Sequence, residues 1–364
     1  MGKIVVFGAT GFTGRLTVAA LVDRGIRPVI AGRSRAKLRA LSERHGGLTT
    51  RLADVGDPAS LARLARRGDI LLTTVGPFTR FGEPVLKAAI EAGAHYLDST
   101  GEPAFIRRVF TDFDGRARER GVALLTAFGY DYVPGNLAAA MALEEVGDRA
   151  TSVDIGYFTF GEGGVAVSEG TAASVALAML EPGLFYRGGQ LREDYGGGRL
   201  RRFQVGPRRR PAVSVPSSEH LTLPRSFPWL RDVNVYLGWF GLASYPLVPL
   251  SRVQALALRI PRVKRYLAGR MQRESQGRGP SAKTRESSGS HIIAQARGAD
   301  GKVLSTVELV GTNTYDYTAG VLAWAADALS QGACARVGAL GPVEAFGLQA
   351  LIEGNEAAGL RVAL

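Results

Sequence analysis

Short apolar runs alternate with helix-like segments over the first 130 residues of the chain. The runs cover residues 4–7, 28–31, 50–54, 70–75, 96–98 and 122–128. Apolar spacing or a first-turn proline predicts helices over residues 15–23, 35–44, from 57 onwards, 83–92 and 103–120. Apolar strands separated by helices are buried on both faces, which is typical of a parallel sheet with right-handed crossovers. We therefore expect a doubly wound α/β domain of the Rossmann type over residues 1–135.

The pattern changes after Gly135. Strand-like runs cover residues 151–160, 212–223, 290–298 and 302–311, and residues 170–181 have helical spacing. Ala299-Asp300-Gly301 joins the last two runs and is a strong hairpin signal. Two segments rich in Gly, Arg, Pro or Ser are predicted to be loops, residues 183–232 and 274–289. We expect an α+β substrate or dimerisation domain on a mixed or antiparallel sheet over residues 136–315.

The end of the chain is helical in pattern. Residues 317–329 and 343–357 have helical spacing, and we expect residues 316–364 to return to the Rossmann domain. The chain opens directly into an apolar strand, so no signal peptide is expected. No apolar run reaches about 18 residues, so no membrane-spanning helix is expected. These features predict a cytoplasmic protein, either free or peripheral at a membrane.

Composition narrows the chemistry. The chain has 364 residues, of which 46% are apolar, enough for a sizeable core without stabilising metals or disulfides. Cys334 is the single cysteine, which excludes an intramolecular disulfide, and there are only four histidines. No metal-ligand cluster and no Ser-His-Asp set stands out, so no metal site is predicted.

Positive charge is concentrated in one window of the chain. Residues 187–285 hold 20 basic and 5 acidic residues, whereas the remainder holds 25 basic and 28 acidic ones. The window lacks a nucleic-acid motif and regular interleaving of aromatic residues with arginine, so nucleic-acid binding is not expected. Three alternatives remain: an acidic carrier protein, an anionic membrane surface, or a solvated arginine-rich surface.

One apolar stretch lies inside the basic window. Residues 233–250 include Trp239 and Phe240 and carry no charge before Arg252. Glycines and prolines interrupt the stretch, so it does not span a bilayer. It is either a buried segment or homodimer interface, or a channel or membrane-contacting surface for a lipid-like substrate.

A glycine-rich loop stands between the first predicted strand and the first predicted helix. Glycine at such a turn lets the backbone approach a pyrophosphate, whose charge the helix N-terminus stabilises. The spacing is GxxGxxG, and its position within a βαβ unit makes it a strong dinucleotide signal. The residues of the loop are Gly8, Ala9, Thr10, Gly11, Phe12, Thr13 and Gly14.

The end of the second predicted strand distinguishes between the two nicotinamide cofactors. An NAD site has a carboxylate there, which accepts a hydrogen bond from the ribose 2′-hydroxyl. Here the strand is followed by Arg33 and Ser34, with Lys37 nearby and no acidic residue before Glu43. A guanidinium can bind a 2′-phosphate through two hydrogen bonds, which predicts NADP(H).

Two further turns complete the predicted cofactor site. Asp54 ends the third strand and is expected near the adenine. The turn after the fourth strand is expected under the nicotinamide, because ligands bind outside the carboxyl ends of parallel strands. That turn consists of Val75, Gly76, Pro77 and Phe78.

The chain resembles a known family at these and other motifs. They are the loop of residues 8–14 and the segments 31–34, 75–78, 82–85, 96–102, 129–134, 311–316 and 341–347. With them the chain resembles the saccharopine dehydrogenase-like oxidoreductases, most closely the bacterial trans-acting enoyl reductases that act on polyketide or fatty-acyl intermediates. The resemblance implies a Rossmann domain, a second α+β domain and a homodimer. Saccharopine-forming enzymes need basic groups for two carboxylated amino acids, which the apolar stretch at 233–250 does not favour.

Hydride transfer to a double bond also needs a proton donor. Tyr130, Asp131 and Tyr132 follow the sixth strand and are the catalytic candidates, while Asp98 and Glu102 are a second set. Alternatively, such residues cap helices and turns.

The predicted function is NADPH-dependent reduction of an activated C=C in an apolar, carrier- or lipid-linked acyl or polyketide-type substrate. The alternatives are an imine reductase of amino-acid or secondary metabolism, and a non-catalytic dinucleotide-binding scaffold.

Overall fold

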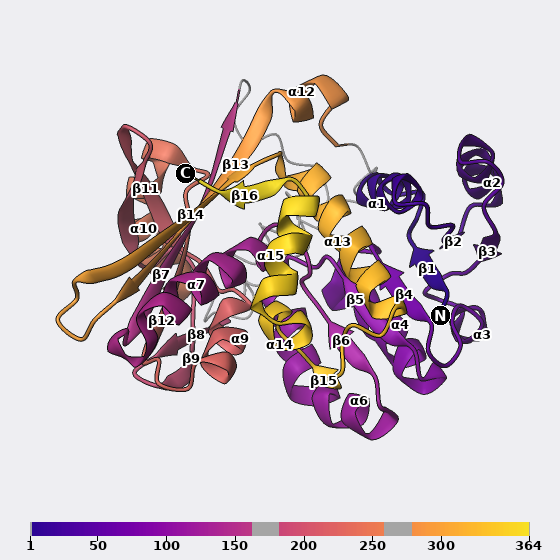
Figure 1. Ribbon diagram of the computed structural model, residues 1–364, viewed down its shortest axis with the longest axis horizontal. Helices are drawn as coiled ribbons and strands as arrows, with labels where there is room; N and C mark the ends of the chain where they lie inside the picture. The colour runs from indigo at the N-terminus through magenta and orange to yellow at the C-terminus, as the bar shows by residue number, and fades with distance from the viewer. Residues whose placement is uncertain (1, 162–181, 258–278, 364) are drawn as a thin grey trace. The chain divides into compact units, whose positions relative to one another are not determined.

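The computed structural model describes residues 2–161, 182–257 and 279–363 (Figure 1). Contacts divide these residues into two compact units. The first unit contains residues 2–100, 108–130 and 314–359, and the second contains residues 101–107, 131–313 and 360–363. The domain boundaries expected from the sequence stay a prediction, and the helix expected at 170–181 lies outside the described residues.

The first unit is built on a parallel sheet of seven strands in the order β15-β6-β5-β4-β1-β2-β3. The strands are β1 (Ile4–Phe7), β2 (Val29–Gly32), β3 (Thr50–Leu52), β4 (Ile70–Thr73), β5 (His95–Asp98), β6 (Ala123–Leu125) and β15 (Gly338–Ala339). Phe7 of β1 is in register with Ala31 of β2 and with Thr73 of β4. The expected doubly wound Rossmann sheet is therefore confirmed, and its strand order reverses beside β1, where such folds bind ligands.

Helices follow these strands in alternation. They are α1 (Phe12–Asp23), α2 (Arg35–Arg44), α3 (Pro58–Ala62), α4 (Phe78–Ala92) and α6 (Asp114–Arg120), with α5 (Pro103–Arg108) and the π-helical stretch η1 (Val109–Phe113) before α6. Asp57 caps α3 ahead of its first-turn proline, as predicted. The predicted start of the fourth helix at residues 83–84 is wrong, because α4 begins at Phe78 and contains Pro84 in its interior. A proline favours a helix's first turn but does not exclude a later position.

The C-terminal helices belong to the first unit. They are α13 (Thr314–Ser330), α14 (Pro342–Phe346) and α15 (Leu348–Ala357). Helix α13 packs against α1 and against strands β1, β4 and β5 (Figure 1).

The second unit is built on a mixed sheet in the order β10-β11-β12-β7-β13-β14-β16. The strands are β7 (Ser152–Gly161), β10 (Leu200–Val205), β11 (Arg208–Ser214), β12 (Asp232–Leu237), β13 (Ser288–Arg297), β14 (Val303–Gly311) and β16 (Leu360–Val362). Strands β7 and β12 are parallel, and the other pairs are antiparallel. The expected α+β fold is confirmed, as is the β13–β14 hairpin.

Residues 183–232 are not the predicted loops. They form β8 (Gly183–Arg187), β9 (Gln190–Asp194), β10, β11 and the helix α9 (Glu219–Ser226). The strand predicted over residues 212–223 stops at Ser214. The arginines were misleading because several are bound to other groups: Arg201 pairs with buried Asp154 and lies over Phe203, and Arg187 pairs with Asp194 and lies over Phe185. An arginine stem of this kind covers apolar surface while its head is paired.

Helix α7 (Val133–Val146) was not predicted and packs against β7, β13 and β14. It is buried on nearly all sides, so its sequence lacks the one-sided apolar pattern that marks a surface helix. A cluster of buried side chains packs elsewhere on the same sheet, made of Phe158, Phe203, Ala212, Tyr236 and Ile293.

The apolar stretch at 233–250 divides into β12, the 3-10 turn η3 (Gly241–Ala243) and the start of α10 (Ser244–Ala257). Among the described residues, every helix is too short or too polar to cross a membrane.

Candidate functional site

The glycine-rich loop of the first unit lies where a dinucleotide's pyrophosphate is expected. It follows β1, and the N–H groups of Gly8 and Ala9 bond to the carbonyl of Ala31 in β2. Helix α1 then begins at Phe12, with no acidic residue in its first turn. The first-turn N–H groups of a helix point out of its N-terminus, so the N-terminus of α1 is a place where an anion can bind.

Two glycines show that the loop is shaped for close approach. A Cβ on Gly14 would lie 2.2 Å from the Gly8 carbonyl oxygen, so only glycine lets α1 pack onto the loop. Gly8 itself has a φ of +86°, which favours glycine. The main-chain geometry therefore fits a pyrophosphate at the α1 N-terminus.

The residues predicted to bind the 2′-phosphate lie at the carboxyl end of β2. Arg33 is exposed directly after that strand, and Ser34 caps α2 by accepting a hydrogen bond from the Lys37 N–H at 3.4 Å. The Ser34 cap uses its oxygen, so its hydroxyl proton can still be donated. Because β1 and β2 are adjacent, these groups and the glycine loop occupy one edge of the sheet.

The remaining predicted cofactor residues lie along the same edge. The Thr74 hydroxyl donates to the Gly8 carbonyl at 3.3 Å, which places the turn of residues 75–78 beside the glycine loop. Asp54 is exposed after β3, where its carboxylate accepts a hydrogen bond from the Gly56 N–H at 2.8 Å. The structure thus brings the predicted cofactor residues to the carboxyl ends of β1 to β4.

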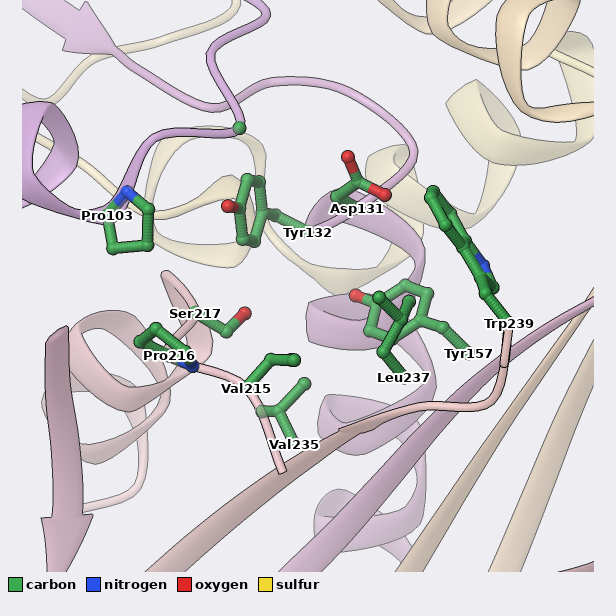
Figure 2. A pocket seen from close by; sticks show the side chains of 11 residues that line it. Pro103, Asp131, Tyr132, Tyr157, Val215, Pro216, Ser217, Val235, Leu237 and Trp239 are labelled. Carbon is green, nitrogen blue, oxygen red and sulfur yellow. The ribbon is translucent and has the colours of Figure 1, made fainter. Parts of the chain in front are cut away.

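The second unit contains a pocket with mostly apolar walls (Figure 2). Its cavity volume is about 70 Å³, room for a few heavy atoms, such as the reacting end of a substrate. The pocket is lined by Gly101, Pro103, Asp131, Tyr132, Tyr157, Val215, Pro216, Ser217, Val235, Leu237 and Trp239. The segment before α7, the strands β7 and β12, and the loop between β11 and α9 supply most of these residues.

Two of the three predicted catalytic residues line this pocket. Asp131 and Tyr132 both do, and burial raises the pKa of the Asp131 carboxyl to about 6. Tyr130 belongs to the first unit, where its ring packs edge-on against Tyr317 at 6.1 Å and its N–H donates to Thr318. The pocket therefore does not include Tyr130.

The second candidate set is placed differently. Asp98 is fully buried, and its carboxylate accepts hydrogen bonds from the N–H groups of Thr100 and Ala127 and from the Thr126 hydroxyl, each at 2.9 Å. Burial raises the pKa of this carboxyl to about 6, although these hydrogen bonds oppose the shift. Asp98 thus links the ends of β5 and β6, as a turn-capping residue does. Glu102 is buried as well.

Sequence reasoning missed three polar residues at the pocket. The Tyr157 hydroxyl donates to the Glu219 carboxyl at 2.6 Å, and the Ser217 hydroxyl donates to the other oxygen of that carboxyl. Glu219 has no exposed surface. Burial raises the pKa of its carboxyl to about 7, against the opposing hydrogen bonds from Ser217 and Tyr157. The one sequence signal was a carboxylate beside two serines in an otherwise apolar run.

Comparisons with known proteins agree with the first unit's geometry. Residues 4–125 match the family described as the saccharopine dehydrogenase NADP binding domain. A trans-acting enoyl reductase from Mycobacterium ulcerans (strain Agy99) is 40% identical over 141 residues, covering 37% of this chain and 34% of that protein. A saccharopine dehydrogenase-like oxidoreductase from Bos taurus is 33% identical over 188 residues, covering 46% of this chain and 44% of that protein. The predicted resemblance and the predicted NADP(H) cofactor are confirmed.

A solved structure extends the similarity of fold to the whole chain. Apo histidine-tagged saccharopine dehydrogenase (L-Glu forming) from Saccharomyces cerevisiae matches with a TM-score of 0.63 and 14% identity, covering 100% of this chain and 99% of that one. At this identity the similarity shows the fold alone. The chain spans less than half the length of the two curated relatives.

Proposed function

We propose that the protein is an NADPH-dependent reductase, on the premise that residues 4–125 match the saccharopine dehydrogenase NADP binding domain. Its substrate is an apolar acyl or polyketide-type molecule with an activated C=C. The cofactor supplies a hydride, and the N-terminus of α1 and Arg33 bind this cofactor. The second unit binds the reacting end of the substrate.

The observation that carries the substrate class is the lining of the second unit's pocket. Its walls are valine, leucine, proline and tryptophan, and its polar groups are Asp131, Tyr132, Tyr157 and Ser217. Lysine and arginine do not occur among the described lining residues. An amino-acid imine carries a carboxylate that needs a cationic partner, whereas an enoyl group does not. The lining therefore favours the C=C over the C=N alternative, and the trans-acting enoyl reductase relative supports the same choice.

Turnover with defined probes tests this function. The purified full chain is mixed with NADPH and either trans-2-octenoyl N-acetylcysteamine thioester or 1-pyrroline, and loss of NADPH absorbance is followed while mass spectrometry identifies the product. We expect the saturated thioester and no pyrrolidine. Reduction of the imine alone would overturn the choice of substrate. NADPH binding without turnover of any enone, enoyl or imine probe would favour the non-catalytic scaffold.

The apolar stretch suggests where such a substrate comes from. Leu242 and Leu250 are 79% and 57% exposed, and Tyr245 is 38% exposed between them. This apolar patch begins three residues after Trp239, which lines the pocket. We propose that the patch contacts an anionic lipid surface, which would place the protein at the periphery of a membrane.

Charge supports the choice of an anionic lipid partner. Helix α10 packs against β10 and β11, and the Arg202 guanidinium lies 5.4 Å from the Tyr245 ring centroid. Arg202, Arg208 and Arg209 are exposed on these strands. Apolar side chains beside arginines suit a lipid headgroup region, where each basic residue adds about 1 kcal/mol of attraction.

Vesicle co-sedimentation tests the lipid surface. We expect the full chain to bind phosphatidylserine-containing vesicles more strongly than phosphatidylcholine vesicles, and expect the double substitution L242S/L250S to abolish binding. L304S removes a comparably placed leucine, 40% exposed on β14, and should bind normally. Equal sedimentation of wild type and the double variant would refute the patch.

Light scattering on the same proteins tests the predicted homodimer.

A further inference from the structure

A buried acid lies directly behind the pocket wall and has no role in the function proposed so far. Glu219 is the first residue of α9 and is fully buried. The hydroxyls of Tyr157 and Ser217 both donate to its carboxyl, and both of these residues line the pocket. The acid is therefore connected to the pocket at two points, through a phenol and through an alcohol.

The local backbone is shaped around this pair. The Gly135 N–H, in the first turn of α7, donates to the Tyr157 hydroxyl oxygen at 3.1 Å. A Cβ at position 135 would lie 2.0 Å from that oxygen and 2.6 Å from the nearer Glu219 oxygen. Only glycine permits this approach. The Tyr157 oxygen consequently lies against the N-terminus of α7, where the helix dipole stabilises negative charge.

We propose that Tyr157 is the catalytic proton donor of the reductase, and that Glu219 and Ser217 are positioning residues that return a proton to it. This proposal rests on the function proposed above. It differs from the expectation for Tyr130, Asp131 and Tyr132, because it is the Tyr157 hydroxyl that is hydrogen-bonded to the buried acid Glu219.

Reduction of an α,β-unsaturated acyl substrate moves protons along these three side chains in order. When the β-carbon has received the hydride, the O–H bond of Tyr157 breaks and its proton forms the new C–H bond at the α-carbon. The Tyr157 phenolate then takes the proton of the Glu219 carboxylic acid. The Ser217 hydroxyl then gives its proton to the Glu219 carboxylate and takes one from a hydronium ion or buffer acid of the solvent, which is the proton that the net reaction consumes. The substrate gains one hydride and one proton, and the three side chains end as they began.

Electrostatics support each of these protonation states. Burial raises the pKa of the Glu219 carboxyl to about 7, so its acid form is present at neutral pH. The titratable groups beside it are Tyr157 from β7 and His220, the next residue of α9, and Asp131 lines the same pocket as Tyr157. Burial lowers the pKa of His220 to about 3, so this ring stays neutral. The Gly135 N–H and the α7 dipole stabilise the transient phenolate.

The test is the pH dependence of turnover of the octenoyl thioester by the full chain. We expect Y157F to lower kcat about 100-fold or more with KM changed less than about threefold, as loss of a general acid does. Wild-type kcat should fall as pH rises through about 7, and E219Q should lower kcat and remove this ionisation from the profile. Y236F is the matched control, since it deletes a buried tyrosine hydroxyl from β12 outside the pocket.

Several outcomes overturn the proposal. One is a Y157F variant with kcat near wild type, and another is a 100-fold loss in Y132F or D131N but not in Y157F. An unchanged pH profile in E219Q would reduce Glu219 to a structural role.

A measurement without substrate separates this proposal from the proposed function. Infrared difference spectra between pH 5 and 9 report protonated carboxyl groups, and we expect a band that titrates near pH 7 in wild type and is absent in E219Q. Absence of that band overturns the acid pair whatever the activity. If the band is present and no probe is reduced, the reductase function fails and the buried pair stands without a proton-donor role.

Discussion

Replacement of Glu219 by glutamine should change how the stability of the second unit depends on pH. In the unfolded chain this carboxyl titrates at its ordinary pKa of 4.5, whereas burial raises the pKa to about 7 in the native state. Between these values the native state binds more protons than the unfolded state. Stability from this group is therefore fully present below about pH 4.5 and is lost as pH rises through about 7.

The magnitude follows from the same two values. A pKa difference between 4.5 and about 7 corresponds to about 3 kcal/mol of unfolding free energy, at about 1.4 kcal/mol per pKa unit. Most of that loss falls between pH 5 and pH 8. E219Q keeps a side chain of similar size that does not titrate, so its stability should lack this component. The unfolding free energy of wild type minus that of E219Q should therefore fall by about 2 to 3 kcal/mol as pH rises.

Urea unfolding followed by tryptophan fluorescence measures this difference. The chain has three tryptophans, of which Trp324 lies in the first unit and Trp229 and Trp239 lie in the second. The W324F background therefore makes fluorescence specific to the second unit. Asp131 also titrates at a raised pKa, but it is common to both proteins and cancels in the comparison. Parallel pH dependences in the two proteins would show that Glu219 does not titrate at a raised pKa in the native state.

Three further predictions concern the first unit. R33A should raise the dissociation constant for NADPH about tenfold, because it removes a charge-assisted bond to the 2′-phosphate at an exposed site. Fluorescence titrations should show NADH binding nearly unchanged, and equal losses of affinity for both cofactors would contradict the assignment of Arg33 to the 2′-phosphate. G14A should lower the unfolding free energy by about 2 kcal/mol and weaken binding of both cofactors, because its Cβ would lie 2.2 Å from the Gly8 carbonyl oxygen. Thermal melts measure the stability, and G115A is the control because a Cβ there has no neighbour within 4 Å. D98A should destabilise the first unit by about 3 kcal/mol in urea unfolding, because two backbone N–H groups and one hydroxyl lose their acceptor.

The sheet of the first unit and its cofactor site could be predicted from the sequence because both depend on local order. A buried parallel strand is a continuous apolar run, and the turns that follow such strands meet at one edge. The glycine loop, Arg33 and the turn after β4 therefore converge although up to 70 residues separate them.

The second unit was harder because its local patterns are ambiguous. Helix α7 is buried on nearly all sides, so its sequence lacks the one-sided apolar stripe of a surface helix. The β10–β11 hairpin resembles a loop in composition because it is rich in arginine, yet Arg201 pairs with Asp154 and lies over Phe203, and Arg210 lies over Phe158. Tyr157 and Glu219 are 62 residues apart and meet only because β7 and α9 both pack near the start of α7. No spacing rule relates residues brought together by a mixed sheet.

Segments of the two units alternate along the sequence, which limits how the protein can be cut into separately folding fragments. The path leaves the cofactor-binding unit at Thr100, re-enters it at Arg108, leaves again after Tyr130 and returns at Thr314. A fragment cut after residue 130 would lack α13, and the apolar side of α1 that this helix covers would face water. An isolated cofactor-binding module would therefore have to be made by joining residue 130 to residue 314 through a short designed linker.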